Sequence, residues 1–106
     1  MSRSTVIALI AVSTSQDANG VWRESESAHR VFAKVDSVSA SEFFEGGRNG
    51  LNPSLRFLIF SGDYHGEPIV EHEGLRYGVY RTYEHGDQTE VYVERKGGTN
   101  GTSNAD

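Results

Sequence analysis

The sequence predicts a mainly β protein, a small antiparallel β-barrel of about six strands with one short helix. Short apolar or alternating segments recur along the chain, and tight-turn residues such as Gly, Asn and Asp separate them. Closing such strands into a barrel removes the unpaired edges that an open sheet exposes. The 106 residues suffice for one domain, predicted over residues 1–95. Residues 96–106 are small, polar or charged apart from one Ala, which predicts a disordered tail.

The first strand is expected at residues 6–12, VIALIAV. This apolar run is far shorter than the roughly 20 residues that a membrane-spanning helix needs, and no signal-peptide cleavage site follows it. We therefore expect a buried N-terminal strand in a soluble protein made inside the cell. The dipeptide Asn19-Gly20 favours a turn after this strand, because both residues tolerate positive φ.

The second strand is expected at residues 29–38, after a polar segment at 23–28. Alternate residues of this strand differ in character. One side carries Val31, Ala33 and Val35, and the other carries Phe32, Lys34 and Asp36. This pattern is typical of a strand with one buried face.

The alternation ends at Ser39, where a helix is expected to begin. Ser39 and Glu42 fit a capping box, in which the Ser hydroxyl accepts from a backbone N–H and the Glu carboxylate returns to the N-cap amide. A short helix is therefore predicted over residues 40–45, anchored by the apolar surface of Phe43 and Phe44. The glycine-rich run GGRNG that follows is expected to end regular structure, so that the segment protrudes from the barrel wall.

Four further strands are expected, at residues 55–60, 69–73, 75–84 and 89–95. The first of them, LRFLIF, is nearly all apolar, which indicates a strand buried on both faces or packed beneath the helix. A tight hairpin at Glu73-Gly74 joins the next two, and residues 85–87 turn the chain into the last. Strict alternation in the strand at 75–84 separates one face, with Tyr77, Val79, Arg81 and Tyr83, from the other, with Arg76 and Tyr80.

The charge balance limits the partners that the chain can bind. The formal net charge is −5 and the pI is about 5.3, which argues against a surface for duplex DNA, since phosphate binding requires concentrated Lys and Arg. An acidic surface is compatible with lining a channel through which DNA slides, because repulsion prevents sticking. Cysteine is absent, so disulfides and thiolate metal sites are excluded.

Two histidines have acidic neighbours in the sequence. His65 lies between Asp63 and Glu67, and His72 lies between Glu71 and Glu73, which raises the possibility of a metal site with imidazole and carboxylate ligands. Glycines and a proline break the regular strand that such spacing would need, so solvated turn residues are the favoured interpretation. His29 and His85 have no evident partner set. No metal site and no other cofactor is therefore predicted.

The chain lacks the motifs of the common enzyme classes. It has no G-x-S-x-G elbow and no Cys, and the run GGRNG lacks the Lys-Ser/Thr of a phosphate-binding loop. Carboxylate pairs such as Glu84 and Asp87 are ordinary turn residues. We expect no catalytic residues and no enzyme activity.

Basic and aromatic residues interleave in one strand, at Arg76, Tyr80, Arg81 and Tyr83. Such residues form stacking platforms for single-stranded nucleic acid, and they are also common anchors in protein interfaces. Nearby acidic residues oppose a phosphate backbone. The four residues are therefore predicted to be a protein-contact face, with a small ligand or single strand as the alternative.

Three segments of the chain resemble the head-closure, or head-tail joining, proteins of long-tailed bacteriophages, a pattern that also recurs in prophages and gene transfer agents. They are VFAKVDSVSASEFFEGGRNGL (31–51), FLIFSGDYHGEPIVEHEGLRYGVYRTYE (57–84) and EVYVERKGG (90–98). The resemblance covers about two thirds of the chain. It consists of a V-S-x-S-E segment, a D-Y-x-G-E turn, an E-G-x-x-Y strand entry and a Y-R-T-Y strand, in that order.

The resemblance implies a stopper, a structural protein that forms a ring below the portal and adaptor of the virion neck. Such a ring closes the exit for packaged DNA, contacts that DNA only by enclosing it, and offers the tail an attachment platform. The implied location is the virion, and the bacterial cytoplasm before assembly, with no membrane contact. A tail-completion protein is the alternative within the family, and a monomeric binding module is the alternative outside it.

The resemblance also assigns a role to the excursion at residues 39–53. In such proteins a loop projects toward the channel, and the residues here that fit a channel or subunit contact are Ser39, Ser41, Glu42, Phe43, Phe44, Glu45, Arg48, Asn49 and Leu51. The glycines are expected to leave this loop mobile until partners order it.

Overall fold

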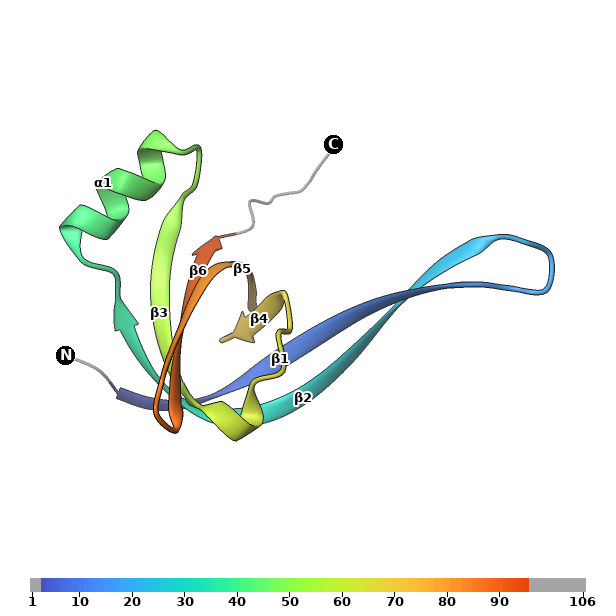
Figure 1. Ribbon diagram of the computed structural model, residues 1–106, viewed down its shortest axis with the longest axis horizontal. Helices are drawn as coiled ribbons and strands as arrows, with labels where there is room; N and C mark the ends of the chain where they lie inside the picture. The colour runs from blue at the N-terminus through green and yellow to red at the C-terminus, as the bar shows by residue number, and fades with distance from the viewer. Residues whose placement is uncertain (1–2, 96–106) are drawn as a thin grey trace.

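Six antiparallel strands close into one barrel, in the neighbour order β1-β2-β3-β6-β5-β4 (Figure 1). The structure is a computed structural model that describes residues 3–95, so the tail predicted at 96–106 lies outside the described residues. The elements are β1 (Arg3–Gln16), β2 (Trp22–Ser37), α1 (Ala40–Arg48), β3 (Pro53–Phe60), the 3₁₀ turn η1 (Ser61–Asp63), β4 (Ile69–His72), β5 (Leu75–His85) and β6 (Gln88–Arg95). The predicted fold class is confirmed.

Alternate residues of the strands fill the barrel interior. The core cluster consists of Ile7, Leu9, Val31, Ala33, Val35, Phe57, Ile59, Val70, Tyr77, Val91 and Val93. The predicted inward face of β2 is thus confirmed. Two alternatives were predicted for β3. Burial on both faces is wrong, because several of its residues are only partly buried and Phe60 is exposed. Packing beneath the helix agrees with the structure, in which Gly46 of α1 lies against Pro53 at the start of β3. Burying one such apolar side chain stabilises the fold by about 1.5–3 kcal/mol, which makes this interior the main source of stability.

The barrel closes through its shortest ladder, which joins β1 to β4. Only three residue pairs link these strands, with Ala8, Leu9 and Ile10 opposite Glu71, Val70 and Ile69. By contrast, β1 pairs with β2 along all 14 of its residues. The closure therefore leaves most of β1 without a second neighbouring strand.

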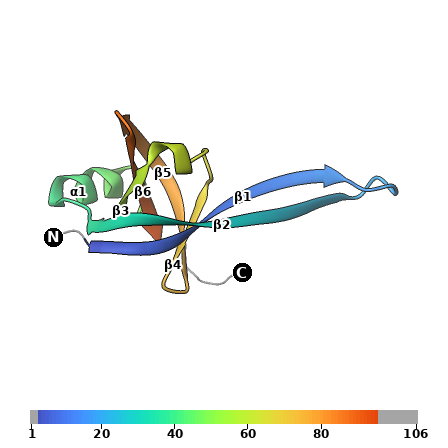
Figure 2. The same ribbon diagram turned by 90° about the horizontal axis from the view of Figure 1, so that it is seen from below.

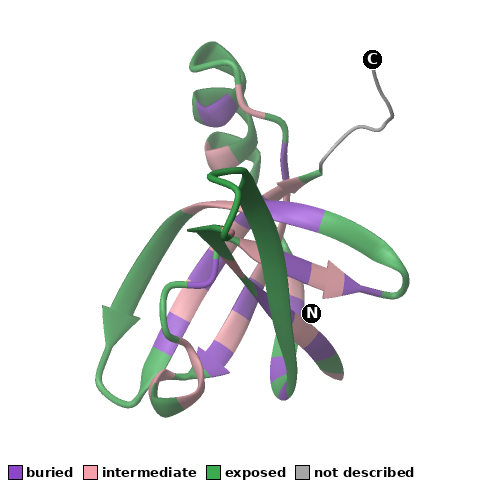
Figure 3. Ribbon diagram, turned by 90° about the vertical axis from the view of Figure 1, so that its right-hand side faces the viewer, coloured by how far each residue is buried: buried purple, intermediate pink, exposed green. Residues whose placement is uncertain are grey.

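The outer halves of β1 and β2 leave the barrel as a two-stranded ribbon, here called the arm (residues 11–27). Within the described residues the arm strands pair only with each other, from Ala11↔Ser27 to Gln16↔Trp22. Six residue pairs at about 3.4 Å each give a reach of about 20 Å. Figures 1 and 2 show the arm projecting from one end of the barrel, and Figure 3, which looks along it, shows it exposed.

The arm corrects two predicted boundaries. The first strand does not end near residue 12, and the polar segment 23–28 is strand rather than a lead-in to one. Both faces of the ribbon meet water, because residues 18–30 are all exposed. A strand without a buried face has no reason to alternate apolar and polar residues, so the alternation pattern could not reveal it.

The helix is longer than predicted. It continues from Ala40 through both glycines to Arg48, with Asn49 as its C-cap. Gly46 is buried, and a Cβ built on it would lie 2.3 Å from Cγ of Pro53 at the start of β3. The missing side chain at Gly46 therefore lets the helix lie against β3, which is a packing role rather than a chain break.

The tight turns follow the sequence prediction. Glu73 and Gly74 both have positive φ, 53° and 79°, and form the two-residue turn between β4 and β5. Two positive φ values give a turn whose twist matches that of the flanking strands. No helix among residues 3–95 has the length and apolar composition needed to cross a membrane.

Candidate protein-contact site

Helix α1 is held to the barrel by the residue predicted to complete its capping box. Ser39 Oγ accepts from the Glu42 N–H at 3.2 Å, as expected. The Glu42 carboxylate does not serve the N-cap amide: it accepts from the Tyr80 hydroxyl at 2.5 Å and from the Arg81 guanidinium at 2.6 Å. Hydrogen bonds to an ionised group are about twice as strong as neutral ones. Glu42 thus joins the predicted excursion to the predicted contact face on β5.

A β-bulge in β5 makes this contact possible. The pairing with β6 shifts register between Val79 and Arg81, which leaves Tyr80 as an extra residue. The strict alternation predicted for this strand is therefore wrong, because Tyr80 and Arg81 both reach Glu42. The Arg81 guanidinium also lies 3.9 Å from the centroid of the Tyr92 ring, a cation–π contact. The bulge thereby gathers two donors beneath the helix.

Tyr80 acts as a neutral donor in this cluster. Its burial, together with its hydrogen bond to Glu42, raises the pKa of the phenol well above its usual value. The Glu42 side chain is largely buried, whereas that of Arg81 is about half exposed. The cluster is thus a satisfied ionic contact at the edge of the helix, in which both donors are already paired with Glu42.

The outer surface of α1 carries the remaining residues of the predicted loop. Phe43 and Phe44 are 47% and 65% exposed and pack edge to face at 5.7 Å. The prediction that they anchor the helix is wrong, because Glu42 and Gly46 do so. The polar residues make local contacts at the two ends of the helix: Ser39 with Ser41, Arg48 with Glu45, and the Asn49 side chain with the Glu45 carbonyl. Leu51 lies at the helix exit, partly buried.

The predicted contact face on β5 is not one continuous surface. Arg76 binds Glu26 at the base of the arm through two hydrogen bonds, of 2.9 and 2.8 Å, whereas Tyr80 and Arg81 bind α1. The bond to Arg76 lowers the pKa of the Glu26 carboxyl. Tyr83 is exposed, with its ring centroid 5.4 Å from that of His85. The four residues therefore contact three different parts of the structure: the arm, α1 and His85 at the end of β5.

The arm ends in an apolar tip that the sequence patterns did not single out. Asp17 shapes the turn, since its carboxylate accepts from the backbone N–H of Asn19 and Val21 and from Arg23, each at 2.9 Å. These bonds lower the pKa of the Asp17 carboxyl, and the bond from the Val21 N–H has the largest effect. They present Val21 and Trp22 to solvent, 51% and 68% exposed. The only Trp of the chain thus lies at the end of a polar ribbon.

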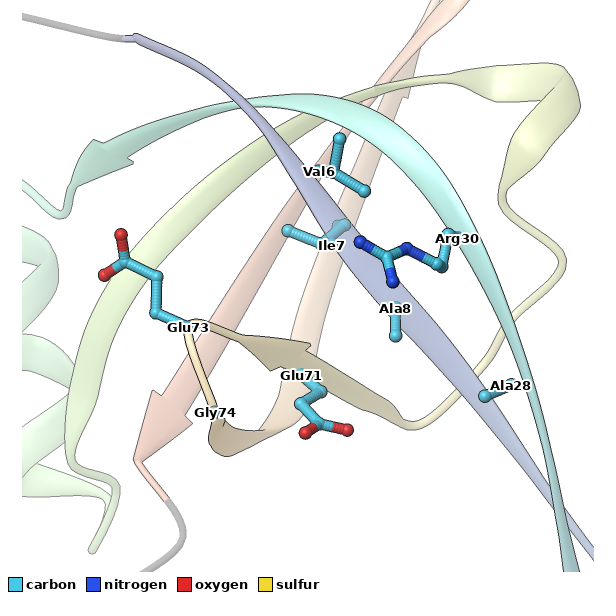
Figure 4. Close-up of a pocket in the computed structure, with 8 residues that line it drawn as sticks. All are labelled: Val6, Ile7, Ala8, Ala28, Arg30, Glu71, Glu73 and Gly74. Atoms are coloured by element: carbon cyan, nitrogen blue, oxygen red, sulfur yellow. The ribbon is translucent and has the colours of Figure 1, made fainter.

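A groove of about 580 Å³ lies between the base of the arm and the β4–β5 hairpin. It is lined by Val6, Ile7, Ala8, Ala28, Arg30, Glu71, Glu73 and Gly74 (Figure 4). The figure shows the Arg30 guanidinium lying across β1, while the carboxylates of Glu71 and Glu73 point away from it. This lining offers no nucleophile paired with a base.

The structure brings together one further set of polar side chains, which sequence spacing could not reveal. His29 on β2 lies beside His65 and Glu67 from the segment between η1 and β4. The prediction of solvated turn residues is wrong for Glu67, which is buried, whereas His65 is exposed as expected. No family model and no curated protein matches this chain.

Proposed function

We propose that this chain is a structural protein of the phage neck, a head-closure protein that assembles as a ring between the portal and adaptor of the head and the tail. The observation that carries the proposal is the arm, a polar two-stranded ribbon with an apolar tip, beside which no third strand lies among residues 3–95. The resemblance of residues 31–51, 57–84 and 90–98 to head-closure proteins gives the class of assembly. The role is structural rather than enzymatic.

The arm is built for contact with another chain. A two-stranded hairpin is marginally stable in water when nothing packs on it, and the residues of this one are almost all exposed. Transferring an exposed Trp and Val into a partner contributes about 2–4 kcal/mol at roughly 25 cal/mol per Å². Aromatic side chains at such positions are typical anchors of interfaces. Trp22 is therefore assigned as the anchor.

The position of the arm relative to α1 supports a ring. The arm leaves one end of the long axis, and α1 with its exposed Phe43 and Phe44 lies at the other, in both views (Figures 1 and 2). Two different surfaces at opposite ends of a subunit produce head-to-tail contacts, which close into a ring when the rotation between neighbours permits. In this arrangement the arm of one subunit reaches its neighbour, and the excursion at 39–53 faces the channel or the next subunit.

The acidic balance is consistent with DNA that passes without binding. A net charge of −5 repels a phosphate backbone and allows a duplex to slide. Arg76 and Arg81, the cations of the predicted contact face, are already paired with carboxylates. A monomeric module that binds single strands through this face is for that reason the weaker candidate.

The experiment that tests the proposal removes the gene from the phage or prophage that carries it. Heads filled with DNA but without tails, or heads that leak DNA, are expected, together with loss of the neck ring in electron micrographs. Complementation with the wild-type chain should restore tailed particles. Normal tailed particles without the gene would refute the proposal, and a defect confined to the distal end of the neck would favour a tail-completion protein.

A matched pair of variants tests the arm. Trp22→Ala is expected to fold as the wild type does and to fail in complementation, because only the tip is altered. Thr14→Ala, an exposed polar position on the same face of the arm, should complement normally. The binding-module alternative predicts a different result, an oligonucleotide affinity that falls steeply with salt and is lost in Arg81→Ala.

A further inference from the structure

Three side chains from two distant segments converge outside the barrel core. One ligand atom from each of His29, His65 and Glu67 lies within 4.8 Å of the others. Oε2 of Glu67 is 3.5 Å from Nε2 of His29 and 3.8 Å from Nδ1 of His65. Both imidazoles therefore face the same carboxylate oxygen.

Glu67 is held in position for this arrangement. Its side chain is 5% exposed, and its other oxygen, Oε1, accepts from the backbone N–H of His65 at 2.7 Å. The Tyr64 hydroxyl donates to the Glu67 carbonyl at 2.9 Å. One carboxylate oxygen is thus occupied by the backbone and the other is directed at the histidines. Such outer hydrogen bonds are what orient the ligands of metal sites.

We propose that His29, His65 and Glu67 form a zinc site. Two imidazoles and one carboxylate are a known Zn²⁺ ligand set, and imidazole ligands favour zinc over magnesium or calcium. Tetrahedral bonds of about 2.0–2.2 Å place ligand atoms about 3.3 Å apart, so the separations of 3.5 and 3.8 Å require only small side-chain movements. Both histidines are exposed, which leaves room for a water molecule as the fourth ligand.

The metal would connect two segments that no strand pairing within residues 3–95 joins directly. His29 pairs with Leu9 just below the point where the arm leaves the barrel. His65 and Glu67 belong to the segment that leads into β4, the strand that closes the barrel. A zinc ion at this place would clip that segment to the base of the arm and fix the direction in which the arm projects. This inference is independent of the proposed function.

The test uses the full, tag-free chain, freed of metal with a chelator and titrated with zinc chloride in a calorimeter. One equivalent of Zn²⁺ is expected to bind, with Mg²⁺ giving no heat. His29→Ala and His65→Ala should each weaken zinc binding by at least about tenfold, because loss of even an outer hydrogen-bond partner of a metal ligand costs about 10–100-fold in affinity. His85→Ala is the matched control, because His85 is a half-exposed histidine beside a different carboxylate, Glu90, and should bind zinc as the wild type does.

Spectra separate a lost ligand from a lost fold. Circular dichroism should show that both alanine variants keep the wild-type fold, since His29 and His65 are exposed. In NMR spectra, the imidazole signals of His29 and His65 should shift with zinc, and those of His72 and His85 should not. The proposal is overturned if the wild type binds no zinc, or if a folded double variant at His29 and His65 binds it as tightly as the wild type.

Discussion

Adding one methyl group at either of two adjacent glycines of α1 is expected to change stability in opposite directions. At Gly46, an added Cβ would lie 2.3 Å from Cγ and 3.0 Å from Cδ of Pro53. The proline ring is rigid and begins a barrel strand, so the helix or the strand must move. At Gly47, an added Cβ has no heavy atom within 4 Å. Both glycines lie in the same turn of α1, so the difference between them is that only Gly46 packs against another element.

The magnitudes follow from two opposing effects. Replacing Gly by Ala inside a helix stabilises it by about 1 kcal/mol. Forcing an extra carbon into a packed contact costs about 1–3 kcal/mol. Gly47→Ala should therefore raise the free energy of unfolding by up to about 1 kcal/mol, and Gly46→Ala should lower it by about 1 kcal/mol. The two variants should differ by about 1–3 kcal/mol, the contribution of the contact with Pro53.

Urea denaturation followed by circular dichroism measures this difference, and thermal melts provide a second reading. For a domain of this size, 1 kcal/mol corresponds to about 4–8 °C in melting temperature, so the two variants should melt at least about 4 °C apart. Equal stability of Gly46→Ala and Gly47→Ala would refute the reasoning, because it would mean that α1 does not lie on Pro53 as the structure has it.

Two further predictions concern buried or paired polar groups. His72 is buried, and its Nε2 has no hydrogen-bond partner among residues 3–95. Because an unsatisfied polar group costs about 1–3 kcal/mol, His72→Leu should raise the urea midpoint, and a lower midpoint would contradict this. The hydrogen bond from Tyr92, and to a smaller extent that from His85, lowers the pKa of Glu90 in the folded protein below its usual 4.5. Ionised Glu90 therefore stabilises the fold fully above about pH 4.5, and this stabilisation is lost as the pH falls through the lower pKa of the folded state. In Glu90→Gln, the free energy of unfolding should fall less steeply between about pH 5 and about pH 3 than in the wild type. Urea titrations at a series of pH values measure this, and an unchanged dependence of the unfolding free energy on pH would count against the pairing.

Much of the barrel could be predicted because its wall obeys simple patterns. Val31, Ala33 and Val35 alternate since one face of β2 meets the core, and the turns at Glu73-Gly74 and Asn19-Gly20 contain residues that accept positive φ. These signals are local, and they depend on one buried face or one backbone angle. The number of strands follows from them.

The missed features all depend on neighbours that are remote in sequence. The arm has no buried face and so no pattern. Gly46 leaves no room for a side chain because Pro53 lies against it, and the bulge at Tyr80 lets that residue reach Glu42, 38 residues away. The cluster at Glu67 needs His29 from another strand. Propensity and residue spacing give information about the segment in which a residue lies. The conformation at the missed positions depends instead on contacts with another segment of the chain.

The arm also has a mechanical consequence. A sideways force at Trp22 acts about 20 Å from the barrel, and the base of that lever is Ile10, which pairs with Ala28 on one side and with Ile69 on the other. The torque is resisted there by the ladder of three residue pairs between β1 and β4. A partner that binds the tip of the arm and pulls on it therefore also applies force to the pairing between β1 and β4, where the barrel closes. That pairing is the shortest ladder of the barrel.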